Sequence, residues 1–177
     1  MTKHVAFFRG INVGGHNMVK MDVLKRLFNS MGFNDVMTIK QSGNVVFESN
    51  SVDKEILRKN IEKKVAESLG IDVHVIVRTM PELQKIVQKN PFKEVDERKV
   101  INLWVTFLSE KPKGKTELPI AIPKTDAEVI AIYGTEAYSV TRTEGDGGKP
   151  NPFIESLLKV GATTRSWGMV KEIVGRG

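Results

Sequence analysis

The hydrophobic residues of the first half alternate between patterns typical of strands and patterns typical of helices. A continuous apolar run at 5–8, ended by Arg9 and Gly10, predicts a strand that is buried on both faces. Apolar residues at helical spacing predict helices over 21–31 and 52–69, each followed by a glycine. Further short apolar runs predict strands over 36–40, 45–48 and 72–78. This order of elements is that of a ferredoxin-like split β-α-β unit.

The second half repeats this outline with its first helix weakened. A helix over 79–89 and a charged stretch over 93–99 precede a predicted strand over 100–108. The polar stretch 109–123 contains three prolines, which leaves room only for a short helix. The remaining predicted elements are a hairpin over 128–141, a helix over 150–160, a turn over 161–165 and a helix over 166–174 capped by Ser166. The sequence therefore predicts an α+β fold of two ferredoxin-like (split β-α-β) subdomains with antiparallel sheets, the second degenerate, over residues 1–92 and 93–177.

Composition excludes several kinds of chemistry but does not identify a function. The chain carries a net charge of +6, which an anionic partner such as a nucleotide or nucleic acid would suit, although a basic solvated surface is the commoner explanation. It contains no cysteine, so disulfides, zinc–thiolate sites and thiol nucleophiles are excluded. No segment approaches the ~20 apolar residues that span a bilayer. The first apolar run is too short for a signal peptide, so we expect a cytoplasmic protein that does not enter membranes.

Two polar loops are predicted to meet at one edge of the first sheet. In a ferredoxin-like sheet of strand order 4-1-3-2, the end of the first strand lies beside the start of the third and of the fourth. Backbone N–H groups, an arginine and several amides would then form an edge suited to an anion, although plain turns explain the same residues. The residues expected there are Arg9, Asn12, Gly14, Gly15, His16, Gln41, Ser42 and Asn44, with His74 as a further candidate and His4 at the opposite end.

Sharper motifs are absent from these loops. Gly10 and Gly15 have the spacing of a phosphate-binding P-loop, but His16 and Asn17 stand where that loop needs lysine and Ser/Thr, so this mechanism is excluded. The chain has no serine nucleophile elbow. Its three histidines lack the spacing of a metal site, so no metal is predicted and no cofactor can be assigned.

The second half adds two candidate binding residues, and its aromatic residues bear on whether the chain binds nucleic acid. Lys149, in the glycine-rich stretch 144–149, is either the counter-charge of a second anion loop or part of a connector. Arg165 and Trp167 could stack on a base or sugar, but a core or interface role for Trp167 is more common. The aromatic signature of an RNA-recognition motif is absent from the predicted strands.

Three motifs together resemble a known family. They are Phe8-Arg9-Gly10-Ile11-Asn12-Val13-Gly14-Gly15, Gln41-Ser42-Gly43-Asn44-Val45-Val46-Phe47 and Ala162-Thr163-Thr164-Arg165-Ser166-Trp167. The chain resembles, over nearly its whole length, the uncharacterised bacterial proteins called DUF1697. The resemblance implies two ferredoxin-like subdomains and implies no activity. The chain departs from the family at His16, where members often carry lysine, and at Ser166, where asparagine is usual; the first change weakens a phosphate role near neutral pH.

Three functional hypotheses remain open at this stage. The first is a binding protein that holds an anionic ligand, a nucleotide or nucleic-acid backbone, at the two-loop edge. The second is an enzyme acting on a phosphorylated or carboxylated small molecule, with Arg9 as anion clamp and His16 or His74 as general base. The third is a protein–protein interaction module. No catalytic constellation selects among them, and the oligomeric state is not encoded in any motif.

Overall fold

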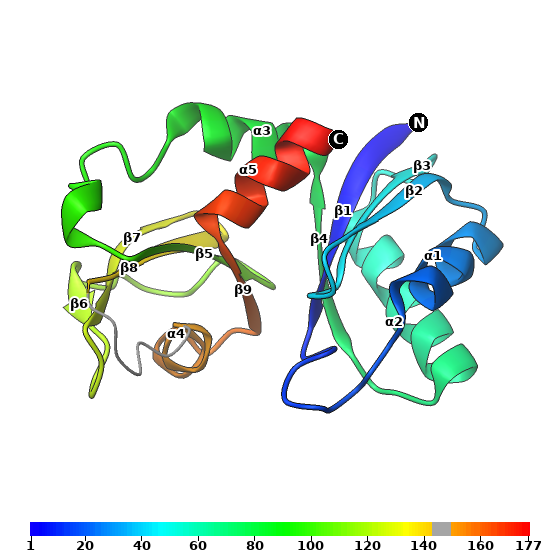
Figure 1. The fold of residues 1–177 in the computed structure, drawn as a ribbon, viewed down its shortest axis with the longest axis horizontal. Helices are drawn as coiled ribbons and strands as arrows, with labels where there is room; N and C mark the ends of the chain where they lie inside the picture. The colour runs from blue at the N-terminus through cyan, green and yellow to red at the C-terminus, as the bar shows by residue number, and fades with distance from the viewer. Residues whose placement is uncertain (143–149) are drawn as a thin grey trace. The chain divides into compact units, whose positions relative to one another are not determined.

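The computed structural model describes residues 1–142 and 150–177 and contains two antiparallel sheets with helices (Figure 1). The α+β fold class predicted from the sequence is confirmed. The chain divides into two compact units, Met1–Gln84 with Ile173–Gly177, and Lys85–Glu172. The predicted subdomain limits, 1–92 and 93–177, stay a prediction. No helix among the described residues has the length and apolar character needed to cross a membrane.

The first unit is a four-stranded sheet with two helices on one face (Figure 1). Its strand order is β2-β3-β1-β4, and each neighbouring pair is antiparallel, as predicted. Alternate residues of the central strand, Ala6 and Phe8, enter the core beneath the helices, where Phe28, Phe47 and Ile61 are also buried. The elements are β1 (Thr2–Arg9), α1 (Met21–Ser30), β2 (Asn34–Ile39), β3 (Asn44–Ser49), α2 (Lys54–Leu69) and β4 (His74–Thr79).

Local capping explains both ends of α2 and the start of the helix that follows β4. Asp53 accepts hydrogen bonds from the backbone N–H groups of Glu55 and Ile56 at the start of α2, and Gly70 ends that helix in the left-handed conformation. The helix α3 (Met80–Lys89) follows β4 directly. Its start is a reciprocal capping box, because Glu82 accepts from the Thr79 N–H at 2.7 Å while its own N–H donates to the Thr79 hydroxyl at 3.3 Å.

The second unit contains a five-stranded sheet in the order β6-β7-β8-β5-β9. Four of these strands, taken as β9-β5-β8-β7, have the order of the first sheet, so the arrangement is compatible with a second ferredoxin-like unit. Residues 109–119, between β5 and β6, form no helix, which is the predicted degeneracy. The elements are η1 (Glu97–Lys99, a short 3-10 helix), β5 (Asn102–Leu108), β6 (Ile120–Ala121), β7 (Ala127–Tyr133), β8 (Glu136–Thr141), α4 (Asn151–Leu158), β9 (Ala162–Ser166) and α5 (Trp167–Arg176).

The predicted turn over 161–165 is wrong, because Ala162–Ser166 is the edge strand β9. Its residues are too polar to suggest a buried strand. They are buried because their polar groups find partners: the hydroxyls of Thr106 and Thr164 lie 2.8 Å apart across the strand pair. The predicted cap of the following helix is confirmed, since the Met169 N–H donates to the Ser166 hydroxyl at 3.2 Å.

His4 is a fully buried histidine on the central strand of the first unit. Its ring stacks on Phe47 with 5.5 Å between ring centres, and Nδ1 lies 2.9 Å from the Thr2 carbonyl. Nε2 has no hydrogen-bond partner among the described residues. Burial lowers the pKa of His4 below its ordinary value of 6.5, with only partial compensation by the Thr2 carbonyl and the Glu82 carboxylate.

Candidate ligand-binding site

The strand register brings the two predicted loops to the same edge of the first sheet. In the strand register Arg9 lies opposite His74 and Phe7 lies opposite Asn44. The ends of β1, β3 and β4 therefore meet there. The Phe8 N–H donates to the Gly43 carbonyl at 2.9 Å, which extends the pairing of β1 into the turn between β2 and β3. This convergence was expected from the topology. His4 lies near the other end of the sheet, beside Thr79 and Phe47, as predicted.

Asn12 joins the two loops through its side-chain amide. Its Nδ2 donates to the carbonyls of Val19 and Gln41, both at 2.9 Å. Its Oδ1 accepts from the Val19 N–H at 2.7 Å. Both amide protons are thereby used within the protein. Asn12 therefore positions the site and offers no free donor to a ligand.

The turn over Gln41–Asn44 packs closely against the first loop. Gly43 has a φ of +72°, and a Cβ placed on it would lie 2.6 Å from Cδ1 of Ile11 and 2.7 Å from Cβ of Phe8. Only glycine satisfies both conditions. Asn44 is fully buried and donates to the Ile39 carbonyl at 3.0 Å and to the Ser42 hydroxyl at 2.9 Å, so its amide, too, has a structural role.

The glycines of the first loop form an exposed turn. The His16 N–H donates to the Val13 carbonyl at 3.1 Å, and these two residues form an isolated bridge. Gly14 and Gly15, at the tip, have φ values of +59° and +79°. His16 is exposed beside them. This turn holds its residues away from the core, where a ligand can reach them.

A pocket of about 460 Å³ opens between the two loops and the start of α1. Asn12 and Gln41 line it from the two loops, and the continuous segment Met18–Asp22 lines the rest. Met18 is 67% exposed although it is apolar. Lys20 precedes the first turn of α1, and no side chain of the described residues caps that helix. The pocket thus combines apolar surface, one lysine, one aspartate and uncapped helix N–H groups.

Most residues of this pocket were not predicted from the sequence. The predicted set gives Asn12 and Gln41, whereas Met18, Lys20, Met21 and Asp22 were missed as site residues. A signal was present: Lys20 stands where helices usually have Ser, Thr, Asp or Asn, which leaves the first N–H groups of α1 without a side-chain partner. Arg9, Gly14, Gly15, His16, Gln41 and Ser42 are exposed at this edge.

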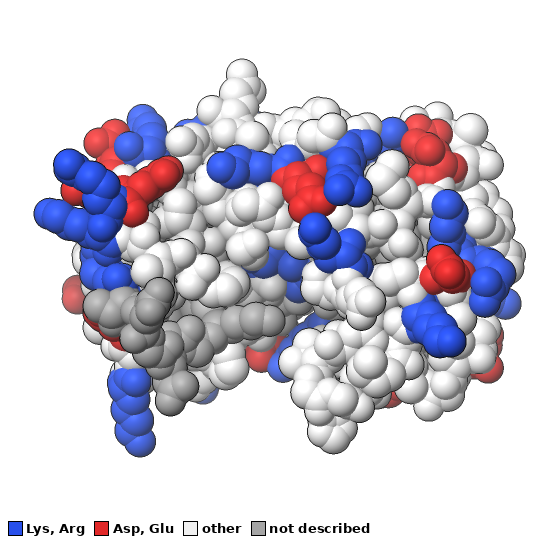
Figure 2. Space-filling view, viewed as in Figure 1, with Lys and Arg blue, Asp and Glu red and all other residues white. Residues whose placement is uncertain are grey.

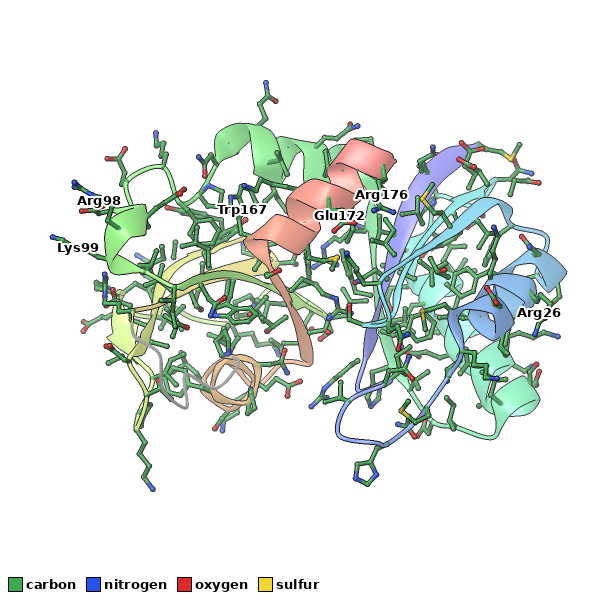
Figure 3. The ribbon with its side chains drawn as sticks, in the orientation of Figure 1. Arg26, Arg98, Lys99, Trp167, Glu172 and Arg176 are labelled. Carbon is green, nitrogen blue, oxygen red and sulfur yellow. The ribbon has the colours of Figure 1, made fainter. Side chains whose placement is uncertain are left out.

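Two predicted residues belong to the second half of the chain. Lys149 lies outside the described residues. Arg165 is a buried residue of β9 in the second unit, where its Nη1 donates to the Thr163 hydroxyl at 2.8 Å and to the Thr164 carbonyl at 2.9 Å. Burial lowers the pKa of Arg165 to about 10, so it stays charged at neutral pH. Trp167, at the start of α5 (Figure 3), is buried against Phe92 with 5.3 Å between ring centres, in agreement with a core role.

Surface charge does not gather into a patch of one sign on the side of the molecule in view (Figure 2). On the side shown in Figure 2, Lys and Arg are spread over the surface and alternate with Asp and Glu. Within the described part of the chain, no group of three His, Asp or Glu side chains could hold a metal ion. The candidate site is therefore defined by its shape and local groups.

The structure is thus that of an α+β protein with two antiparallel sheets. A family model described as "Protein of unknown function (DUF1697)" matches residues 1–138, and the chain belongs to this family. A solved structure titled as the conserved bacterial protein SP0830 from Streptococcus pneumoniae is similar, with a TM-score of 0.70 and 20% sequence identity over 98% of this chain and 97% of that chain. This similarity shows the fold alone. No curated protein matches the chain.

Proposed function

We propose that the protein binds a nucleotide in the pocket between Asn12, Gln41 and the start of α1. The observation that supports this most is the composition of the pocket: apolar methionines lie next to a lysine and an uncapped helix N-terminus. A nucleotide needs both kinds of surface, because its base is flat and apolar and its phosphate is anionic. A volume of about 460 Å³ suits a ligand of that size.

The apolar half of the pocket receives the base. Met18 and Met21 have flexible, polarisable side chains that adapt to an aromatic ring. Met18 is 67% exposed without a ligand, so covering it removes apolar surface from water. Val19 is already buried and forms the fixed wall between them.

The polar half receives the phosphate. The helix N-terminus offers backbone N–H groups and a partial positive charge, and Lys20 adds a full charge. Asp22, in the first turn, opposes this field, so we expect modest affinity, with a Kd on the order of 0.1 mM. The exposed His16 and Gln41 stand on the two loops that border the pocket and can add contacts to the sugar.

The proposal is tested by calorimetric titration of adenosine monophosphate into the full chain. Lys20→Ala is expected to weaken binding about tenfold, because a charge-assisted contact is lost. Lys25→Ala is the matched control: Lys25 is exposed on the same helix and does not line the pocket. Equal weakening by both variants would mean that only general surface charge is involved and would contradict the proposal.

The nucleic-acid form of the hypothesis is tested by a salt series with a short single-stranded oligonucleotide. Binding to a phosphate backbone weakens steeply with salt, whereas a single nucleotide neutralises few charges and depends on salt weakly. Oligonucleotide binding much tighter than mononucleotide binding, with a steep salt slope, would replace the nucleotide proposal by a backbone-binding one.

A further inference from the structure

A second pocket lies in the second unit, in the connection that lacks a helix. It has a volume of about 290 Å³ and is formed by residues of the 109–119 segment together with Ile132 of β7 and Gly134 of the turn between β7 and β8. Two lysines and a threonine, Lys111, Lys115 and Thr116, contribute its polar groups. Leu118 and Ile132 contribute apolar surface.

The described residues that line the pocket carry positive charge only. Two of them are lysines and none is acidic. Within the described part of the chain, neither Lys111 nor Lys115 forms an ion pair, unlike Lys3, Lys54, Arg58 and Arg142. Lys113 lies between them in sequence and is exposed, but it does not line the pocket. Two lysines that line one small cavity give it a positive potential, which a bound anion offsets.

The walls of the pocket are fixed at both ends of the segment. At its start, the Leu108 N–H donates to the Thr135 carbonyl at 2.8 Å and the Ser109 N–H donates to the Gly161 carbonyl at 2.7 Å. At its end, Leu118 packs against the core under α4, as does Ile132 of the neighbouring strand. Both ends of the segment are thereby held, which limits the conformations open to the residues between them and lowers the entropic cost of binding.

The position of this pocket in its unit corresponds to that of the first pocket in the other unit. In the first unit, Phe8 near the end of β1 donates to Gly43 in the β2–β3 turn, and the pocket lies between the following connection and that turn. In the second unit, Leu108 at the end of β5 donates to Thr135 in the β7–β8 turn, and the pocket again lies between connection and turn.

We propose that the pocket over 109–119 binds a small phosphomonoester. Lys111 and Lys115 hold the phosphate with the Thr116 hydroxyl, and Leu118 and Ile132 contact the carbon skeleton. The volume is at the lower end of the range for small-molecule sites, which selects a compact organic phosphate over a whole nucleotide or a polymer. This site is independent of the nucleotide proposal, because it belongs to the other unit.

The test is an NMR titration of the 15N-labelled full chain with phenyl phosphate, with inorganic phosphate and phenol as separate arms. We expect saturable shifts at the amides of Gly114, Thr116 and Gly134, which line the pocket or its rim. We expect binding of inorganic phosphate to be at least about fivefold weaker, because it leaves the apolar wall uncovered. Phenol is expected to cause no saturable shift there. Site-resolved shifts separate this pocket from the one beside α1.

The matched variants lie in one short segment. Lys111→Gln combined with Lys115→Gln is expected to weaken phenyl phosphate binding at least about tenfold, whereas Lys113→Gln changes it less than about twofold. All three lysines are exposed, so the variants are expected to fold. Absence of saturable shifts, equal weakening by Lys113→Gln, equal binding of phenol, or equally tight binding of inorganic phosphate would each overturn the proposal.

Discussion

The two units place a pocket at the same point of their topology but build it by different means. In the first unit a side-chain amide, Asn12, joins the loop to the neighbouring turn with one hydrogen bond, to the Gln41 carbonyl, and holds Val19 of its own loop with two more. In the second unit the corresponding segment is anchored by the apolar Leu118 and by backbone hydrogen bonds. A polar anchor fixes direction more strictly than an apolar one, since hydrogen bonds require alignment and dispersion does not. We therefore expect the first pocket to be more sensitive to single substitutions.

The charges of the two pockets differ as well. Lys20 and Asp22 cancel in the first, and its distinguishing feature is the apolar surface of Met18 and Met21. The second has Lys111 and Lys115, and no acid among the described residues that line it. The difference indicates that the first pocket selects a ligand through its apolar part and the second through its anionic part.

The largest expected effect concerns the turns that border the pockets. Gly43→Ala is expected to destabilise the protein by about 3 kcal/mol, because φ is +72° and the new methyl group meets Ile11 and Phe8. Gly134→Ala, at the corresponding turn, is expected to cost only about 1 kcal/mol, because φ is +61° but nothing lies within 4 Å. Urea unfolding of both variants measures this. Equal costs would show that the two turns are packed alike.

A smaller loss is expected when the polar anchor is removed. Asn12→Ala leaves the Val19 and Gln41 backbone groups without their partner and is expected to cost about 2 kcal/mol. Asn17→Ala is the control in the same loop, since Asn17 makes one longer hydrogen bond, 3.3 Å to the Gly10 carbonyl, and both residues have a positive φ. Thermal unfolding followed by circular dichroism compares them. A control variant as damaging as Asn12→Ala would refute the anchoring role.

Acid is expected to weaken the first unit and not the second. All three histidines lie in the first unit, and burial lowers the pKa of His4. The unfolded chain therefore takes up a proton near pH 6.5 while the folded chain does not, so stability is complete above pH 6.5 and falls below it. Hydrogen exchange at pH 7 and pH 5.5, for the protein and for His4→Phe, measures this. Unchanged acid sensitivity in His4→Phe would contradict it.

A second titratable group, Glu82, loses its contribution to stability at a lower pH than His4 does. Burial alone would raise the pKa of Glu82, but Lys54 at 2.6 Å and the N–H and hydroxyl of Thr79 outweigh it, and the pKa is lowered. Its contribution to stability is present above the ordinary value of 4.5 and is lost as the pH falls further. Loss of stability between pH 6.5 and 5.5 is thus assigned to His4.

The smallest expected effect is a gain. Asp22→Asn removes the charge that opposes a phosphate at the start of α1 and is expected to tighten adenosine monophosphate binding about threefold. Arg26, which is exposed on α1 (Figure 3), offers a control, since it does not line the pocket. Calorimetry compares Asp22→Asn with Arg26→Gln. Weaker binding in Asp22→Asn would place the phosphate away from the helix.

The sheet of the first unit could be predicted from the sequence because its strands are apolar and its helices are amphipathic. The strand order followed, and with it the meeting of the loops at Arg9, Asn44 and His74. Strand β9 could not be predicted, because its threonines resemble a turn until a cross-strand partner supplies hydrogen bonds.

The pocket beside α1 could not be predicted from the spacing of residues in the sequence. Asn12 was predicted as a ligand residue, and the structure uses its amide within the protein. No sequence motif marks Met18, and its exposure follows from the path of the loop. Polar residues in a loop have the same pattern whether they serve the backbone or a ligand, and only the hydrogen-bond partners distinguish the two.

The most direct test of the nucleotide proposal is an NMR titration of the 15N-labelled full chain with adenosine monophosphate at physiological salt. The account predicts saturable shifts at the amides of residues 18–22 and of Gln41, with a smaller response at Lys25 and Arg26. Shifts spread over exposed lysines throughout the chain, or no saturable shift at residues 18–22, would contradict it.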